Sequence, residues 1–253
     1  MPQIGDTYAD GRARISQLLA GLTDDEADAP VPACPAWTVH DVAAHLVGGC
    51  ADILAGNIEG VASEAWTAAQ VEARKGASVS ELLAEWADVG PQVEAFADAF
   101  PGRSGHQWIT DQTSHEHDIR GALRRPGGRD STGLDIALDF LVGVGFDNSL
   151  SARGLGPIEV RAGDRRWVVG SATPTSADPA ALLATDMAAR DDAEAPPDPV
   201  AVVEAPPFEL FRALSGRRSV RQIETFDWSV DPSDYIVAFR YGPFVTSPTD
   251  LVE

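Results

Sequence analysis

The stretch that decides the fold is Trp108-Ile-Thr-Asp-Gln-Thr-Ser-His-Glu-His-Asp-Ile-Arg-Gly-Ala-Leu123, in which acids, histidines and small apolar residues share one expected helix. Residues three and four apart lie on one face of a helix, so Asp111, His115 and Asp118 point the same way. Cβ atoms at that spacing are about 5–6 Å apart, which lets a carboxylate oxygen and an imidazole nitrogen converge on a metal with bonds of about 2 Å. A third ligand must then come from elsewhere in the chain.

The best candidate for that ligand is His45, in the stretch Pro35-Ala-Trp-Thr-Val-His-Asp-Val-Ala-Ala-His-Leu-Val-Gly48. Thr38 followed by Asp41 predicts a capping box that opens a second helix, and apolar residues at helical spacing give this helix a core-facing stripe. His45 lies beside that stripe. A histidine in such a place is by itself more often structural, and its pairing with the 108–123 helix favours metal binding. Asp118 either accepts the second ring N–H of His115 or pairs with a nearby arginine.

Both stretches resemble the N-terminal domain of the mycothiol-dependent maleylpyruvate isomerase family, a branch of the DinB-like four-helix metalloproteins. The matching pieces are Cys34-Pro-Ala-Trp-Thr-Val-His-Asp-Val-Ala-Ala-His-Leu46 and Asp111-x-x-x-His115-x-x-Asp118-Ile. The resemblance implies a metal triad of His45, Asp111 and His115. The family usually has glutamate where this chain has Asp111.

The resemblance also implies an enzyme that depends on a divalent metal, zinc by its two-histidine, one-carboxylate set, and on mycothiol. The metal would bind the thiol sulfur at an open coordination position and lower its pKa, and the thiolate would add to a small, electrophilic, anionic substrate. An isomerase would release the thiol again after bond rotation, and an S-transferase would leave it attached. The alternative is a non-catalytic metal- or ligand-binding bundle.

Towards the other end, Phe208-Glu-Leu-Phe-Arg-Ala-Leu-Ser-Gly-Arg-Arg-Ser219 and Phe226-Asp-Trp228 are similar to the C-terminal domain of the same family. An arginine of that domain is thought to bind the anionic substrate or the thiol, and it falls on Arg217 or Arg218. We expect these arginines and the metal ligands to share a cleft. The alternative is that both arginines follow a helix end and favour its dipole.

The hydrophobic pattern predicts a mainly α protein that becomes α+β, with a helical bundle over residues 1–153 and a smaller α+β domain over residues 154–253. The resemblance implies that the bundle is a DinB-like four-helix bundle. Residues 62–74 look like a short segment of small residues between helices. Residues 157–169 predict a hairpin around an Ala-Gly-Asp turn, and residues 191–199 a surface loop. The predicted helices cover about 7–22, 38–56, 78–100, 108–123, 133–151 and 208–214, and a further strand is predicted at 200–203. Ser78 followed by Glu81 predicts a second capping box, which opens the 78–100 helix.

Composition limits the partners and the location. A formal charge of −20 and a pI near 4.4 argue against nucleic acid and anionic membrane surfaces. No apolar run spans a bilayer and no signal segment opens the chain, so we expect a cytoplasmic protein. Cys34 and Cys50 are too few for a disulfide scaffold, and neither has the helical spacing to join Asp111 and His115. We therefore expect a small-molecule substrate and a low-molecular-weight thiol supplied from outside the chain.

Overall fold

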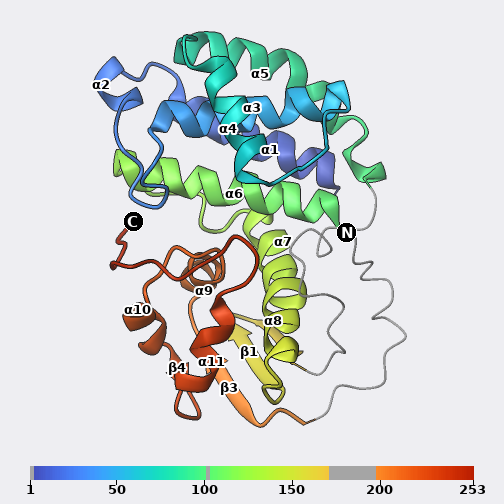
Figure 1. Ribbon diagram of the computed structural model, residues 1–253, viewed down its shortest axis with the longest axis vertical. Coiled ribbons are helices and arrows are strands. Elements are labelled where there is room, and N and C mark those ends of the chain that lie inside the picture. The colour runs from blue at the N-terminus through green and yellow to red at the C-terminus, as the bar shows by residue number, and fades with distance from the viewer. Residues whose placement is uncertain (1–2, 101–102, 171–197) are drawn as a thin grey trace. The chain divides into compact units, whose positions relative to one another are not determined.

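The computed structural model describes residues 3–100, 103–170 and 198–253, so residues 191–197 of the predicted surface loop lie outside the described part (Figure 1). The chain forms two compact units. The first comprises Met1–Phe100, Asp111–Gly128 and Glu253, and the second comprises Pro101–Thr110 and Arg129–Val252. The fold is mainly α and then α+β, which confirms the predicted class.

The first unit is built on long helices that lie side by side, coloured blue to green in Figure 1. Two of the sequence expectations for their starts are confirmed, because the structure has capping boxes at Thr38–Asp41 and at Ser78–Glu81. The long helices are α1 (Ile4–Leu19), α3 (Val39–Ala55), α5 (Val79–Glu94) and α6 (Ser104–Leu123), of which α6 contributes its residues from Asp111 onward; α2 (Asp24–Ala27), α4 (Glu64–Arg74) and η1 (Ala97–Ala99) complete the unit.

A buried carboxylate joins two of these helices. Glu116 of α6 is fully buried and accepts hydrogen bonds from the guanidinium groups of Arg14 on α1 and Arg120 one helical turn away. The shortest contacts are 2.8 Å from Arg14 Nη2 to Glu116 Oε2 and 2.9 Å from Arg120 Nη2 to Glu116 Oε1. Two cations therefore neutralise one carboxylate at the α1–α6 contact.

Helix α4 is an element that the sequence pattern did not predict. Ser63 opens it by accepting a hydrogen bond from the Trp66 N–H, and it runs to Arg74. Because Gln70 is its one buried residue, α4 has no apolar face of the kind that marks an amphipathic helix. The small-residue segment expected at 62–74 is thus a helix over most of its length.

The second unit has a four-stranded mixed sheet in the part of the chain that the structure describes, with strand order β2-β1-β3-β4. The hairpin predicted at 157–169 is confirmed: β1 (Ile158–Ala162) and β2 (Arg165–Val169) pair antiparallel, and Gly163 at the turn has a φ of 60°. β3 (Ala201–Glu204) pairs parallel with β1 and antiparallel with β4 (Asp227–Trp228). After α6, the helical elements described in the second unit are α7 (Thr132–Phe140), the π-helical turn η2 (Leu141–Phe146), α8 (Asp147–Ala152), α9 (Pro207–Leu214), α10 (Val220–Glu224), α11 (Ser233–Ile236) and η5 (Val237–Phe239).

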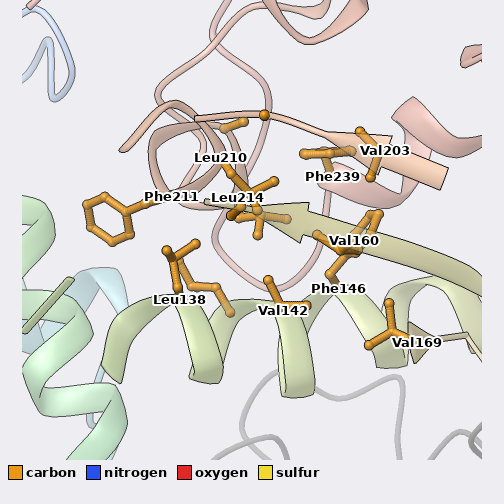
Figure 2. Close-up of a cluster of buried hydrophobic side chains, with 14 of the residues drawn as sticks. Leu138, Val142, Phe146, Val160, Val169, Val203, Leu210, Phe211, Leu214 and Phe239 are labelled. Carbon is orange, nitrogen blue, oxygen red and sulfur yellow. The ribbon is translucent and has the colours of Figure 1, made fainter. Parts of the chain in front are cut away.

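The helical run from α7 to α8 packs on this sheet (Figure 2). Leu138, Val142 and Phe146 point from the run towards Val160 of β1, in the same buried cluster as Leu214 of α9. For this reason residues 129–153 group with the second unit, whereas the sequence placed them in the bundle with a boundary near residue 153. A helix that is apolar on several sides carries no sign of which neighbour will cover it.

Cys50 makes the stability of the first unit sensitive to alkaline pH. It is buried on α3 with its Sγ 3.3 Å from Tyr8 Oη, and burial raises the pKa of its thiol from 9.0 to about 11. A thiol whose pKa is higher in the folded than in the unfolded protein stabilises the fold at any pH below its unfolded-state pKa. This contribution is lost as the pH rises from the unfolded-state pKa to the folded-state pKa. Between pH 9 and pH 10 we expect the free energy of unfolding to fall by about 1 kcal/mol on account of Cys50.

Denaturant unfolding at several pH values between 8 and 10 measures this loss. The Cys50→Ala variant should lack that part of the slope, and Cys34→Ala is the matched control that should keep it. An unchanged slope in Cys50→Ala would contradict the assignment.

Candidate metal centre

The structure brings His45 of α3 together with Asp111 and His115 of α6. Their potential ligand atoms all lie within 4.8 Å of one another. His45 Nε2 is 3.4 Å from Asp111 Oδ2, and His115 Nε2 is 3.5 Å from Asp111 Oδ1. Both imidazoles are buried, while the Asp111 side chain is 43% exposed. The two imidazoles of the cluster therefore lie inside the bundle, and its carboxylate is accessible to solvent.

The other nitrogen of each ring has a hydrogen-bond acceptor. His45 Nδ1 lies 2.7 Å from Gln70 Oε1, and His115 Nδ1 lies 3.0 Å from Asp118 Oδ2. Because both partners are acceptors, Nδ1 carries the proton of each neutral ring, and the Nε2 lone pairs face Asp111. Of the two roles open to Asp118 from the sequence, the structure shows the contact with His115.

These donor atoms fit a small tetrahedral cation. With bonds of about 2.0–2.1 Å, neighbouring ligand atoms of a tetrahedral zinc site lie roughly 3.4 Å apart. The two separations from Asp111, 3.4 Å and 3.5 Å, match that spacing. Two neutral imidazoles and one carboxylate also form the ligand set of many catalytic zinc sites. The shorter aspartate thus reaches both histidines without the extra methylene of glutamate.

The pKa of His45 shows that this cluster favours a bound positive charge. Burial lowers the pKa, but the charge of Asp111 and the hydrogen bonds to Asp111 and Gln70 outweigh burial and raise it above its ordinary value. The negative Asp111 therefore favours a positive charge beside it. A cation bound here competes with the His45 proton, which is the usual reason that metal affinity falls at low pH.

Two tryptophans flank the histidine rings. The ring of Trp37 lies 5.2 Å from that of His45 and 5.7 Å from that of His115, between centroids, and Trp66 of α4 meets His45 edge-on at 6.4 Å. Trp37 lies within the motif that contains His45, but no sequence pattern marked either tryptophan as part of the site. Their packing limits how far the two imidazoles can rotate.

The two cysteines occupy different surroundings. Cys34 is half-buried beside the candidate metal centre, where its S–H donates to Asp118 Oδ2 at 3.4 Å, the oxygen that also accepts from His115 Nδ1. Cys34, His115 and Asp118 thus form a second group of potential ligand atoms that shares His115 with the first. Cys50 lies in the core and contacts Tyr8.

Arg217 and Arg218 lie in the second unit, just after the end of α9. The Arg217 backbone N–H donates to the carbonyl of Arg212 at 2.7 Å, and its guanidinium donates to the carbonyl of Ser215. Arg218 is buried and donates to both carboxylate oxygens of Glu209. Arg217 thus contacts carbonyl groups at the helix end, which is the structural alternative considered from the sequence; anion binding by either arginine stays a prediction.

The fold of the first unit and its cluster of two histidines and a carboxylate define a helical bundle with a potential metal site. Residues 8–126 are similar to a family described as the mycothiol maleylpyruvate isomerase N-terminal domain, whose model matches this stretch. The match includes all three residues of the cluster and confirms the resemblance seen in the sequence. Comparison with curated proteins and with solved structures gives no match.

The match ends at residue 126, so the resemblance of residues 208–219 to the C-terminal domain of the family stays a prediction. Among the described residues, no helix combines the length and the apolar character needed to cross a membrane.

Proposed function

We propose that the protein is a metal- and thiol-dependent enzyme, an isomerase or S-transferase that uses zinc and mycothiol to act on a small, electrophilic, anionic substrate. One observation carries the proposal: His45 and His115 direct their Nε2 atoms at a solvent-open Asp111 within a mycothiol-family domain. A closed structural site would take a fourth ligand from the protein, whereas a catalytic site keeps that position open.

The residues of the chain divide the work between them. His45, Asp111 and His115 would hold the cation, while Gln70 and Asp118 orient the two rings from behind. When bound, the cation would take up the sulfur of a low-molecular-weight thiol and lower its pKa, so that thiolate is present near neutral pH. The exposed side of Asp111 leaves room for the substrate to approach from solvent.

The cysteines of the chain support an external thiol. The pKa of Cys50 is raised by burial to about 11, so Cys50 stays protonated at neutral pH. Cys34 donates its S–H to the Asp118 carboxylate, so its sulfur is engaged as a thiol in a hydrogen bond within the protein. Since only the thiolate is a strong nucleophile, neither cysteine is well suited to the attack.

The test begins with metal analysis of the purified protein after zinc reconstitution, where we expect one cation per chain. Turnover is then assayed with maleylpyruvate and with general electrophiles, each with and without mycothiol. Recovery of mycothiol free or attached to the product separates isomerase from transferase. Metal binding without thiol-dependent turnover would indicate the non-catalytic bundle, and absence of stoichiometric metal would contradict the proposal.

Arg217 is proposed to bind the anionic group of the substrate or thiol. A charge-assisted hydrogen bond is worth roughly 1.5–3 kcal/mol, so Arg217→Gln should raise KM for an anionic substrate by about 10-fold or more and leave KM for an uncharged electrophile unchanged. Steady-state kinetics with the two substrates measure this difference. Arg218→Gln is the comparison, because loss of its buried contacts with Glu209 should lower stability first. Equal effects of Arg217→Gln on both substrates would contradict anion binding.

A further inference from the structure

Helix α4 buries a polar residue where a helix normally buries apolar ones. Gln70 is only 2% exposed, and it is the one buried residue between Glu64 and Arg74. Its side chain enters the bundle behind His45, on the ring edge that faces away from Asp111. Burial of an amide is costly unless its hydrogen bonds are made, so its partners show what holds it there.

The hydrogen bonds around Gln70 fix which way its amide points. Gln70 Nε2 donates to Asp52 Oδ2 at 2.7 Å, and Gln70 Oε1 lies 2.7 Å from His45 Nδ1. Asn57 Nδ2 in turn donates to Asp52 Oδ1 at 2.9 Å. A carboxylate only accepts hydrogen bonds, so the amide N–H must face Asp52 and the amide oxygen must face His45.

Backbone packing permits this contact and polar bonds maintain it. A Cβ added to Gly48 of α3 would lie 2.6 Å from Gln70 Cβ, so the missing side chain lets α4 approach α3 closely. At the start of α4, Trp66 Nε1 donates to the Asn57 carbonyl at 3.0 Å. At its end, Arg74 forms an ion pair with Glu85 of α5. The position of the whole of α4 against α3 and α5 therefore determines how deeply the Gln70 side chain is buried.

We propose that Gln70, braced by Asp52, is a positioning residue that holds His45 in its Nδ1–H tautomer with Nε2 directed at Asp111. The role in metal retention rests on the proposed function, whereas the role in the tautomer does not. Because Gln70 is part of α4, a displacement of this helix from α3 should move the Gln70 amide and lower the affinity for the cation. Neither Gln70 nor Asp52 contacts the cation position itself.

The test compares Gln70→Leu, which keeps much of the volume and removes the acceptor, with Gln92→Leu, an exposed glutamine on α5. In the metal-free protein, at a pH where the His45 ring is neutral, ¹⁵N chemical shifts of that ring should report Nδ1–H in wild type and a shift of population towards Nε2–H in Gln70→Leu. Zinc affinity by chelator competition should fall about 10–100-fold in Gln70→Leu and stay unchanged in Gln92→Leu.

A charge exchange supplies the decisive control. Asp52→Asn alone lets the Gln70 amide turn over and present its N–H to His45, so it should also disturb the tautomer. The double variant Gln70→Glu with Asp52→Asn places a carboxylate acceptor at His45 and an amide donor behind it, and should recover both the tautomer and most of the affinity. This pair also decides the question if Gln70→Leu does not fold.

Wild-type tautomer and affinity in Gln70→Leu, or no recovery in the folded double variant, would overturn the proposal. If the wild-type protein binds no metal, the proposed function fails. The tautomer measurement then still tests whether Gln70 fixes the tautomer of His45.

Discussion

Replacement of His45 by alanine is expected to abolish thiol-dependent turnover, by roughly a thousandfold or more, because it removes one of three protein ligands and several kcal/mol of charge stabilisation. The bundle should stay folded. Loss of the imidazole leaves a small cavity and an unpaired Gln70 oxygen, which together cost about 1–3 kcal/mol of the free energy of unfolding. An open catalytic site thus differs from a closed structural one, whose metal loss unfolds the domain.

Paired assays of turnover and thermal melting, each with and without mycothiol, measure these two effects. His40→Ala is the matched control, because His40 lies on the same helix and bonds to the Ala77 carbonyl at 2.7 Å. It should keep both metal and activity. Full activity without added thiol, or activity lost in Cys34→Ser with metal intact, would favour an internal nucleophile.

Replacement of Glu116 by leucine is expected to destabilise the first unit by about 3–5 kcal/mol, since it removes one partner of a buried ion pair and leaves the charge of the others uncompensated. Glu116 is fully buried, and the Arg14 and Arg120 side chains are 30% and 15% exposed. Partial exposure allows water to reach both guanidinium groups, which places the cost towards the lower end of that range.

Denaturant unfolding followed by tryptophan fluorescence measures the change. Glu72→Leu is the control: its partner Lys75 and Glu72 itself are exposed, and such pairs contribute about 1 kcal/mol at most. Glu116→Gln should fall between the two, because an amide oxygen still accepts from one arginine. A Glu116→Leu variant as stable as the control would show that the arginines find other partners at no cost.

Local patterns predicted much of the first unit from sequence alone. Capping boxes at Thr38 and Ser78 depend on residues three apart, and the shared face of Asp111 and His115 depends on residues four apart, so no tertiary knowledge was needed. His45 lies far from Asp111 in the sequence, and the family motif rather than helical spacing linked the two. Their role in metal binding remains a prediction.

Other features depend on packing that a single sequence does not display. Gln70 was missed because α4 lacks an apolar stripe, so the helix itself was not predicted and its buried face had no signal. The run 129–153 was assigned to the bundle because its apolar residues fit any core. If residues 64–74 had been recognised as a helix, Gln70 opposite the Gly48-Gly49 pair would have indicated a polar residue buried between the two helices.

The absent side chain at Gly48 has a consequence for how such sites persist in evolution. A larger residue at this position would collide with the Cβ and Cγ of Gln70 at 2.6 Å and 2.8 Å and with Arg74 Nη1 at 2.9 Å, and so would push α4 outwards. Natural variation at a position that touches no ligand can thereby silence the centre while His45, Asp111 and His115 are all retained. Among relatives, inheritance of the ligand triad alone is therefore an incomplete sign of an inherited activity.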